Sequence, residues 1–285
     1  MNFMPNGVRS SPLKIHLALP LCVCLYPIHL KLQLSYFKEV AKRLRQQLGD
    51  EDGQKLRSNA VYLFSMGGND YMVLKTDPKL SVLTAAYKMT FMTMVVGNFT
   101  TVIKVGCSDS AIPSSLKGGR KFAFQKVGPI GCMLATQASS GIDGCLHDPS
   151  VLAKMHNIAL SRLLRKLAYQ HAGFSHALFD HYTSVTLRTL CSSKFGKSPS
   201  TLLKSSLPSS TACCGSGPYN GNFICGCGKN GTAKYNLCGH PSEFVWFDPG
   251  RPTESANRQL ASLLWNGPAR VVGPYNLKMF FNGSS

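Results

Sequence analysis

Acidic residues are scarce in this sequence of 285 residues: 13 Asp and Glu stand against 31 Lys and Arg, which gives a formal net charge of +18. Charged residues make up only 15% of the chain, so the imbalance comes from missing acids rather than from surplus bases. A nucleic-acid-binding protein instead gathers Lys and Arg into runs with aromatic residues between them. The densest basic stretches, Lys38–Arg45 and Lys154–Lys166, follow helical patterns. We therefore expect weak general attraction of anions and no nucleic-acid partner.

Long apolar runs and Cys-x-x-Cys spacings are also absent. No uninterrupted apolar run reaches the roughly 18 residues that span a bilayer, so no stable membrane span is predicted. Eleven cysteines, five of them between residues 213 and 238, favour a disulfide-stapled loop of a secreted protein. A zinc site is the rival interpretation of that cluster, although the missing Cys-x-x-Cys pair disfavours it. The apolar segment 15–30 matches a signal peptide poorly, because prolines and histidines interrupt it.

Apolar strand-like runs alternate with helical patterns along the chain. The expected strands cover residues 60–66, 121–127, 176–182 and 244–248, and the expected helices cover residues 35–48, 80–104, 151–170 and 253–265. Such alternation predicts a parallel sheet with helices on both faces. Functional residues in folds of this kind gather beyond the carboxyl ends of the strands. Residues 67–70 and 248–251 both follow strand-like runs, which makes both turns candidate sites.

Ordered sequence blocks between about Leu32 and Leu277 carry a family resemblance. They are LQLSYFKEV (32–40), VYLFSMGGNDYM (61–72), GGRKFAFQKVGPIGC (118–132), HNIALSRLL (156–164), FSHALFDHYT (174–183), ACCGSGPYNG (212–221), YNLCGHPSEFVWFDP (235–249), RPTESANRQLA (251–261) and GPYNLK (273–278). The chain resembles the plant GDSL esterase/lipase family of the SGNH hydrolase superfamily. This resemblance implies a flavodoxin-like three-layer α/β/α sandwich with a parallel sheet. It also implies a secreted serine hydrolase that acts on acyl esters or lipids without a cofactor or metal.

The family mechanism uses a serine nucleophile in a Gly-Asp-Ser block, donors for the oxyanion, and an Asp-x-x-His pair that completes the triad. By resemblance, Asn69 in the GGND turn (67–70) is the oxyanion-hole donor and Asp248 is the triad acid. Three residues after Asp248, where the family has His, this sequence has Arg251. Arginine stays protonated and has no lone pair with which to accept a proton, so it cannot act as the base. As alternatives, Asn69 could cap a turn and Asp248 could cap a helix, both ordinary structural roles.

Other parts of the family machinery have no counterpart in these residues. The Gly-Asp-Ser-Leu block and the glycine of the second block are absent, and the Asp-Ser dipeptide at 109–110 lacks a preceding glycine. His240, the histidine nearest to Asp248 in the sequence, resembles part of a structural loop and is expected at the surface. We therefore predict no nucleophile, and an inactive or severely impaired hydrolase. The alternative is a non-catalytic protein that binds acyl or cell-wall esters, with Arg251 contributing a positive charge.

The resemblance also predicts the organisation of the chain. Residues 32–285 are expected to form a partial hydrolase-like domain that follows a divergent segment, residues 1–31. The sheet is expected to lack the family's first strand, which carries the nucleophile, as a mis-spliced or wrongly assigned transcript would produce. The family implies an extracellular location, and three sequons, at Asn98, Asn230 and Asn282, agree with it.

Overall fold

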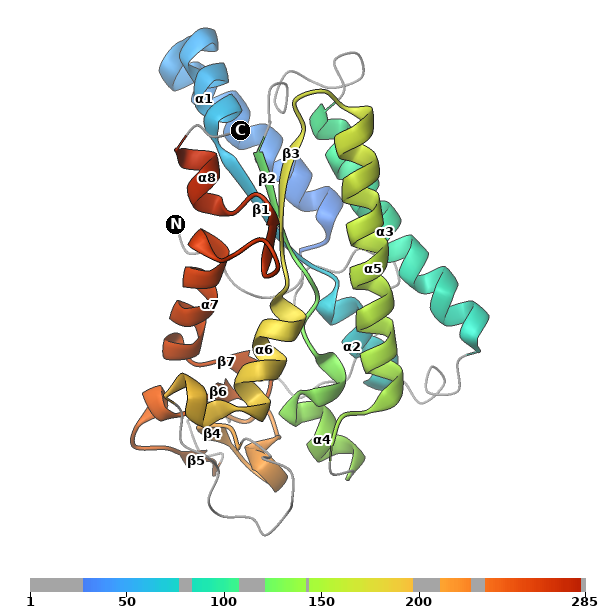
Figure 1. Ribbon diagram of the computed structural model, residues 1–285, viewed down its shortest axis with the longest axis vertical. Coiled ribbons are helices and arrows are strands. Elements are labelled where there is room, and N and C mark those ends of the chain that lie inside the picture. The colour runs from blue at the N-terminus through green and yellow to red at the C-terminus, as the bar shows by residue number, and fades with distance from the viewer. Residues whose placement is uncertain are drawn as a thin grey trace.

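A computed structural model of the chain describes residues 28–76, 84–107, 121–141, 144–196, 211–226 and 234–282. Segment 1–27, which holds most of the expected divergent and signal-like region, lies outside the described residues, as does the Asp-Ser dipeptide at 109–110. A four-stranded sheet stands between two layers of helices (Figure 1). One layer contains α3 (Ala85–Cys107) and α5 (His147–Gln170), and the other contains α7 (Glu254–Asn266) and α8 (Leu277–Phe281). The predicted three-layer α/β/α class is confirmed.

The central sheet is mostly parallel. Its order is β1 (Val61–Ser65), β2 (Lys121–Gln125), β3 (Ser175–Phe179) and β8 (Val272–Pro274). The first three strands are parallel, and β8 pairs with β3 in the antiparallel direction. Within the described residues β1 is an edge of the sheet, and the ring of Phe37, on α1 (Leu30–Asn59), packs edge-on against Tyr62 of β1.

The sequence analysis misplaces the end of one strand and misses another strand. The expected strand 176–182 is too long, because β3 ends at Phe179 and α6 (His181–Leu190) begins two residues later. The physical reason is a helix cap, since the Asp180 carboxylate accepts a hydrogen bond from the backbone N–H of Thr183. Strand β8 was not predicted from the sequence, because its three residues form no apolar run.

The alternation of side chains along the strands divides the core between the two faces of the sheet. Phe122 and Phe124 of β2 pack with the leucines of α5, whereas Ala123 between them packs on the opposite face with Leu260 and Leu264 of α7. Successive strand residues point to opposite faces, so a run that is apolar throughout serves both layers. This explains why the strand-like runs of the sequence lack a polar side.

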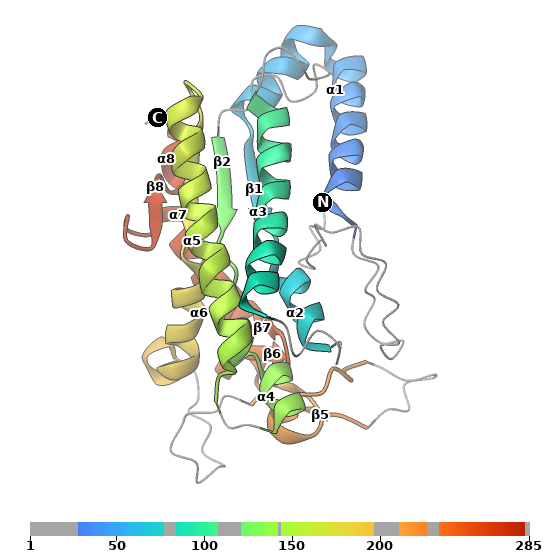
Figure 2. The same ribbon diagram turned by 90° about the vertical axis from the view of Figure 1, so that its right-hand side faces the viewer.

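The remaining elements surround this sandwich. They are α2 (Gly68–Thr76), α4 (Leu134–Ser140), β4 (Cys214–Gly215), β5 (Asn236–Leu237), β6 (Trp246–Asp248) and β7 (Arg251–Pro252). Helix α1 starts earlier than the expected residue 35 and breaks at Gly49, where φ is +81°. Figures 1 and 2 place α2, α4, β6 and β7 at one end of the sheet, where β1, β2 and β3 finish. Among the described helices, none combines the length and the apolar character required to cross a bilayer.

Candidate functional site

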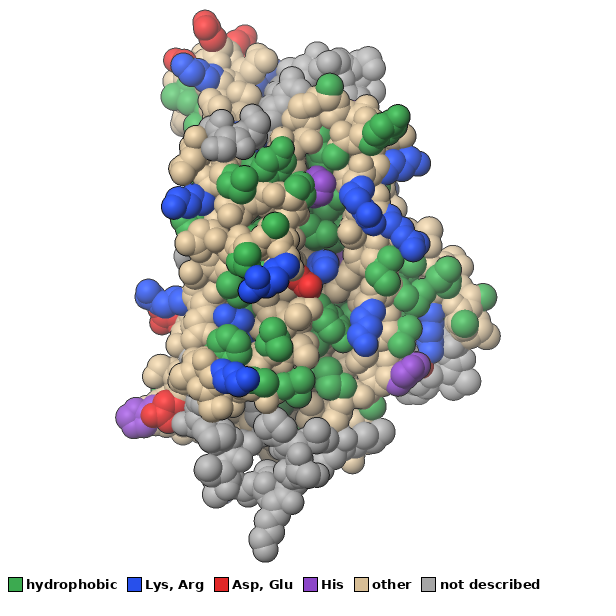
Figure 3. All heavy atoms as spheres, viewed as in Figure 1, with side chains coloured by type: hydrophobic (Ala, Val, Ile, Leu, Met, Phe, Trp, Pro, Cys, Tyr) green, Lys and Arg blue, Asp and Glu red, His purple; other side chains and the backbone are tan. Residues whose placement is uncertain are grey.

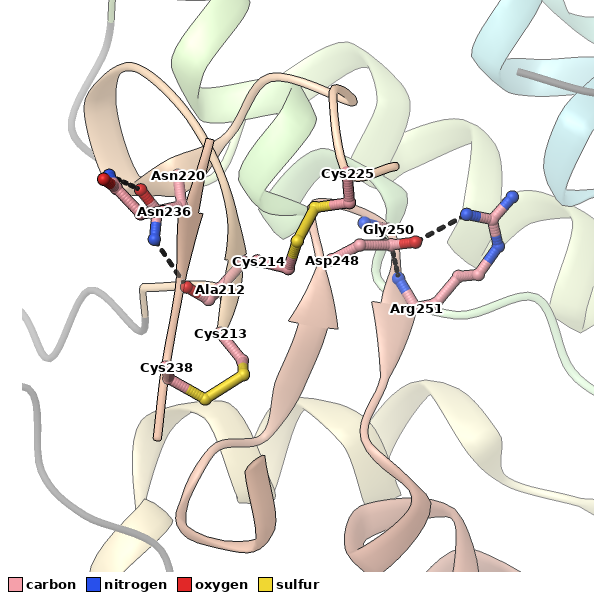
Figure 4. The surroundings of a disulfide bond; sticks show 10 residues. All are labelled: Ala212, Cys213, Cys214, Asn220, Cys225, Asn236, Cys238, Asp248, Gly250 and Arg251. Carbon is pink, nitrogen blue, oxygen red and sulfur yellow. Dashed lines mark hydrogen bonds and ion pairs between the residues drawn. A yellow bond between two sulfur atoms is a disulfide. The ribbon is translucent and has the colours of Figure 1, made fainter. Parts of the chain in front are cut away.

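Asp248 is the last residue of β6, which forms a tight hairpin with β7. Its Oδ1 accepts hydrogen bonds from the backbone N–H groups of Gly250, at 3.0 Å, and Arg251, at 2.8 Å. Such side-chain-to-backbone bonds two and three residues ahead stabilise a turn, which explains how Asp-Pro-Gly-Arg reverses the chain here. Only 7% of Asp248 is exposed, so its carboxylate is desolvated and depends on these donors (Figure 4).

Arg251 pairs with the second oxygen of the same carboxylate. Its Nη1 lies 2.5 Å from Asp248 Oδ2, and the side chain of Arg251 is 40% exposed against 10% for that of Asp248. The guanidinium carbon also lies 5.9 Å from the ring centroid of Phe223. Gly250, in the same turn, packs tightly against two side chains, because a Cβ on this residue would lie 2.8 Å from Phe223 and 2.9 Å from Met133. Asp248 and Arg251 therefore form a salt bridge, and both oxygens of the carboxylate are engaged.

Asn69 lies in the first turn of α2, directly after β1. The turn depends on Gly67, whose φ is +99° and whose Cβ, if it had one, would lie 2.9 Å from His156 Cε1. Asn69 is half-buried, and helix α2, which carries it, lies at the same end of the sheet as β6 and β7 (Figure 2). The structure thus brings Asp248 and Arg251 into contact, and it places Asn69 on a separate element at the same end.

A buried histidine packs against the Gly67 turn. His156 of α5 is fully buried, and its Nδ1 lies 2.7 Å from the hydroxyl of Tyr71, a buried residue of α2. The other ring nitrogen, Nε2, is buried and has no hydrogen-bond partner among the described residues. Burial lowers the pKa of His156 to about 4. The helix that carries the candidate Asn69 is therefore held against α5 by a neutral imidazole.

We expect acid to weaken the fold through this histidine. The pKa of His156 is near 6.5 in the unfolded chain and about 4 in the folded chain. Between these two pH values the unfolded chain binds a proton that the folded chain does not bind, so the free energy of unfolding decreases as the pH falls. A shift of this size corresponds to about 3 kcal/mol. Urea unfolding of the wild type and of His156→Gln, at roughly neutral pH and near pH 4.5, measures the difference. An unchanged pH dependence in the variant would contradict this assignment.

The carboxyl ends of β2 and β3 carry polar groups that sequence reasoning did not single out. Lys126 Nζ lies 3.4 Å from Asp180 Oδ2, and both side chains are about one quarter exposed. His181 follows Asp180, and burial lowers its pKa to about 4. A Cβ on Gly128 would lie 3.3 Å from the His181 ring, so the β2 turn packs directly on this histidine. The sequence did not reveal these groups, because the expected strands 121–127 and 176–182 contain Lys126, Asp180 and His181, whereas β2 ends at Gln125 and β3 ends at Phe179.

The structure also tests the predictions for His240 and for the cysteine cluster between residues 213 and 238. His240 is exposed, as expected for a loop residue. Four of the five clustered cysteines form the disulfides Cys213–Cys238 and Cys214–Cys225, and Cys227 lies outside the described residues. The disulfide interpretation of the cluster is therefore confirmed for those four. In the described part of the chain, no three His, Cys, Asp or Glu side chains converge as a metal site requires.

The fold and the position of these groups define an α/β/α protein whose candidate site lies beyond the carboxyl ends of parallel strands, where enzymes of this architecture act. The family described as GDSL-like Lipase/Acylhydrolase matches residues 6–264. This chain belongs to that family, as the sequence resemblance predicted.

Individual relatives agree with this assignment. "GDSL esterase/lipase 1" of Arabidopsis thaliana is 38% identical over 257 residues, which cover 89% of this chain and 64% of the relative. "GDSL lipase" of Tanacetum cinerariifolium is 38% identical over 256 residues, or 90% of this chain and 62% of the relative. "Inactive GDSL esterase/lipase-like protein 25" of Arabidopsis thaliana is 33% identical over 224 residues, or 78% and 47%. The chain spans less than two thirds of the length of these relatives.

Proposed function

We propose that this chain binds acyl esters or lipids in the manner of its family but hydrolyses them poorly or not at all. The observation that carries the proposal is the Asp248–Arg251 ion pair, with its 2.5 Å separation of Nη1 and Oδ2. In the family pattern the residue three positions after the acid is the histidine that removes the proton from the nucleophile. A guanidinium cannot take a proton at physiological pH, so the pair provides charge neutralisation and no base.

The role of Asp248 changes accordingly. In a triad, the acid orients an imidazole and stabilises the imidazolium that forms. Here the same carboxylate receives two backbone N–H groups and a guanidinium, so its function is structural and electrostatic. Asn69 is the residue type that the family uses as an oxyanion donor, and without a nucleophile and a base such a donor supports only residual turnover. The existence of a relative named as inactive supports loss of activity within this family.

The test of this proposal is to treat the purified chain with a fluorophosphonate probe and with p-nitrophenyl acyl esters. We expect no stoichiometric serine labelling, and turnover at least about a hundredfold below that of a relative with an intact Asp-x-x-His pair, because general-base catalysis contributes about 10² to 10⁴. Stoichiometric labelling of one serine, together with turnover matching that relative, would reject the proposal.

The binding part of the proposal is tested separately, by measuring the affinity of the chain for fatty-acyl ligands that are not turned over. Arg251 presents a partly exposed guanidinium beside Phe223, which suits a ligand with a carboxylate or ester oxygen and an apolar chain. Arg251→Ala is expected to weaken binding several-fold. The matched control is Arg258→Ala on α7, an exposed arginine paired with Glu254, which should leave binding unchanged. Equal affinity of all three proteins would remove Arg251 from the site.

The proposed compartment is extracellular. Disulfides persist in oxidising environments and are rare in reducing ones. Three are present in the described residues: Cys132–Cys145, Cys213–Cys238 and Cys214–Cys225. They support the proposal more strongly than the sequons do, because Asn98 lies half-buried within α3.

A further inference from the structure

The outer face of α5 carries a line of basic and apolar side chains that the ester site does not use. On its inner face, Leu160, Leu164 and Leu167 are buried against the sheet. The outward positions recur at intervals of four, four, four and three residues, which places them along one side of the helix. We name this line the α5 stripe, and its exposed members are Lys154, Ile158, Arg162, Lys166 and Tyr169.

The α5 stripe has cations without acids. Residues 149–170 contain no Asp or Glu, and exposed Arg165 adds a further positive charge beside the stripe. Figure 3 shows Lys and Arg side chains spaced along α5 on this face. Helix α1 differs, because its exposed bases are interspersed with acids such as Glu39, which pairs with Arg43. No acid within residues 149–170 of α5 compensates this positive charge, so this part of the helix attracts anionic surfaces.

Two apolar members of the α5 stripe narrow the choice of partner. Ile158 is 53% exposed and Tyr169 is 93% exposed, although both have apolar surface that water solvates poorly. A dissolved acidic polysaccharide would satisfy the cations but would give Ile158 no apolar environment. An anionic lipid surface satisfies both kinds of side chain, since bases meet the headgroups while apolar and aromatic groups enter the boundary with the acyl chains.

We propose that the α5 stripe docks this protein on the surface of an anionic lipid bilayer. The helix lies along the membrane plane, with its buried leucines still facing the sheet. This docking goes beyond the proposed function and does not depend on ester binding or hydrolysis, because the stripe shares no residue with the Asp248–Arg251 pair.

The experiment is co-sedimentation of the whole chain with vesicles of phosphatidylcholine alone and of phosphatidylcholine with phosphatidylserine. We expect binding to the anionic vesicles that weakens with added salt, and little binding to the neutral ones. Replacing two bases in Arg162→Gln/Lys166→Gln is expected to lower the partition coefficient roughly 30-fold. Ile158→Gln should lower it by up to about tenfold at unchanged charge. Glutamine preserves the helix, because its helix propensity is high.

The matched control removes the same amount of charge from α1. Lys42 and Lys55 are exposed, and Lys42→Gln/Lys55→Gln is expected to change the partition coefficient by no more than about twofold. Equal losses in the two double variants would overturn the proposal, because binding would then follow the net charge of the chain. Absence of binding to anionic vesicles would also overturn it. So would tight binding of polygalacturonate that displaces the vesicles and is insensitive to Ile158→Gln, since the partner would then be a polyanion.

Discussion

Replacing Asn157 with leucine is expected to lower the free energy of unfolding by about 4 kcal/mol. Asn157 of α5 is buried, and its amide makes two hydrogen bonds to one backbone residue, Val127. Its Oδ1 accepts the Val127 N–H at 2.8 Å, and its Nδ2 donates to the Val127 carbonyl at 2.9 Å. Leucine has a similar volume but leaves one buried donor and one buried acceptor unsatisfied, each of which costs about 1–3 kcal/mol.

The position of Val127 makes this substitution informative about the site as well as about stability. Val127 follows the last residues of β2, where the chain leaves the sheet and can no longer pair with β1. The Asn157 amide replaces that pairing, and it thereby fixes the turn in which Gly128 packs on His181. Urea unfolding measures the effect. Asn257→Leu on α7 is the control, because Asn257 is exposed and its side-chain amide donates a 3.3 Å hydrogen bond to the Pro252 carbonyl. The cost of this substitution should stay within about 0.5 kcal/mol. Equal costs for the two variants would contradict the role given to Asn157.

Strands β1 and β2 and the turn at residues 248–251 were predictable because local patterns encode them. Both strands contain short apolar runs that are followed by glycine-containing turns, and the three central residues of β2 are buried, as a strand covered on both faces requires. Thr253 is the N-cap of α7, as its place before Glu254 indicates, and its hydroxyl accepts from the Ala256 N–H. The Asp248–Arg251 contact follows from their separation by three residues across a tight turn.

The buried polar contacts that α5 makes with other elements were only partly predictable. His156 stands four residues after Leu152 and four before Leu160, both buried, so helical spacing alone indicates burial of the histidine. Spacing does not reveal its partner, because Tyr71 comes from another helix, 85 residues away. The Asn157–Val127 bonds are hidden for the same reason. Long-range pairings of polar groups depend on how elements pack, and a single sequence carries no local signal of that packing.

For the cysteine cluster, too, the sequence predicted that disulfides form but not which cysteines pair. Crowded cysteines predicted a stapled loop, but four cysteines allow three pairings, and spacing does not choose among them. The observed choice nests Cys214–Cys225 within the longer loop closed by Cys213–Cys238. These bonds matter for the site, because the Cys213 N–H donates to the carbonyl of Trp246 at 2.9 Å, and Trp246 begins the strand that ends in Asp248.

Removing both nested disulfides is expected to lower the free energy of unfolding by about 5 kcal/mol. Loops of 25 and 11 residues are worth roughly 3.5 and 3 kcal/mol separately in the chain-entropy account, and nesting makes the combined value smaller than the sum. The four-alanine variant of these cysteines is compared with the wild type by urea unfolding. The control is Cys191→Ala, which removes a free thiol.

The pair-specific variants show which bond supports the site. Cys213→Ala/Cys238→Ala should release β6 and make the segment around Trp246 susceptible to proteolysis, because Cys213 is hydrogen-bonded to that strand. Cys214→Ala/Cys225→Ala should leave β6 protected while loosening residues 215–225. If the first variant kept the wild-type unfolding midpoint and protease resistance, the Asp248–Arg251 hairpin would owe its position to the buried packing of Trp246 and Val245 alone.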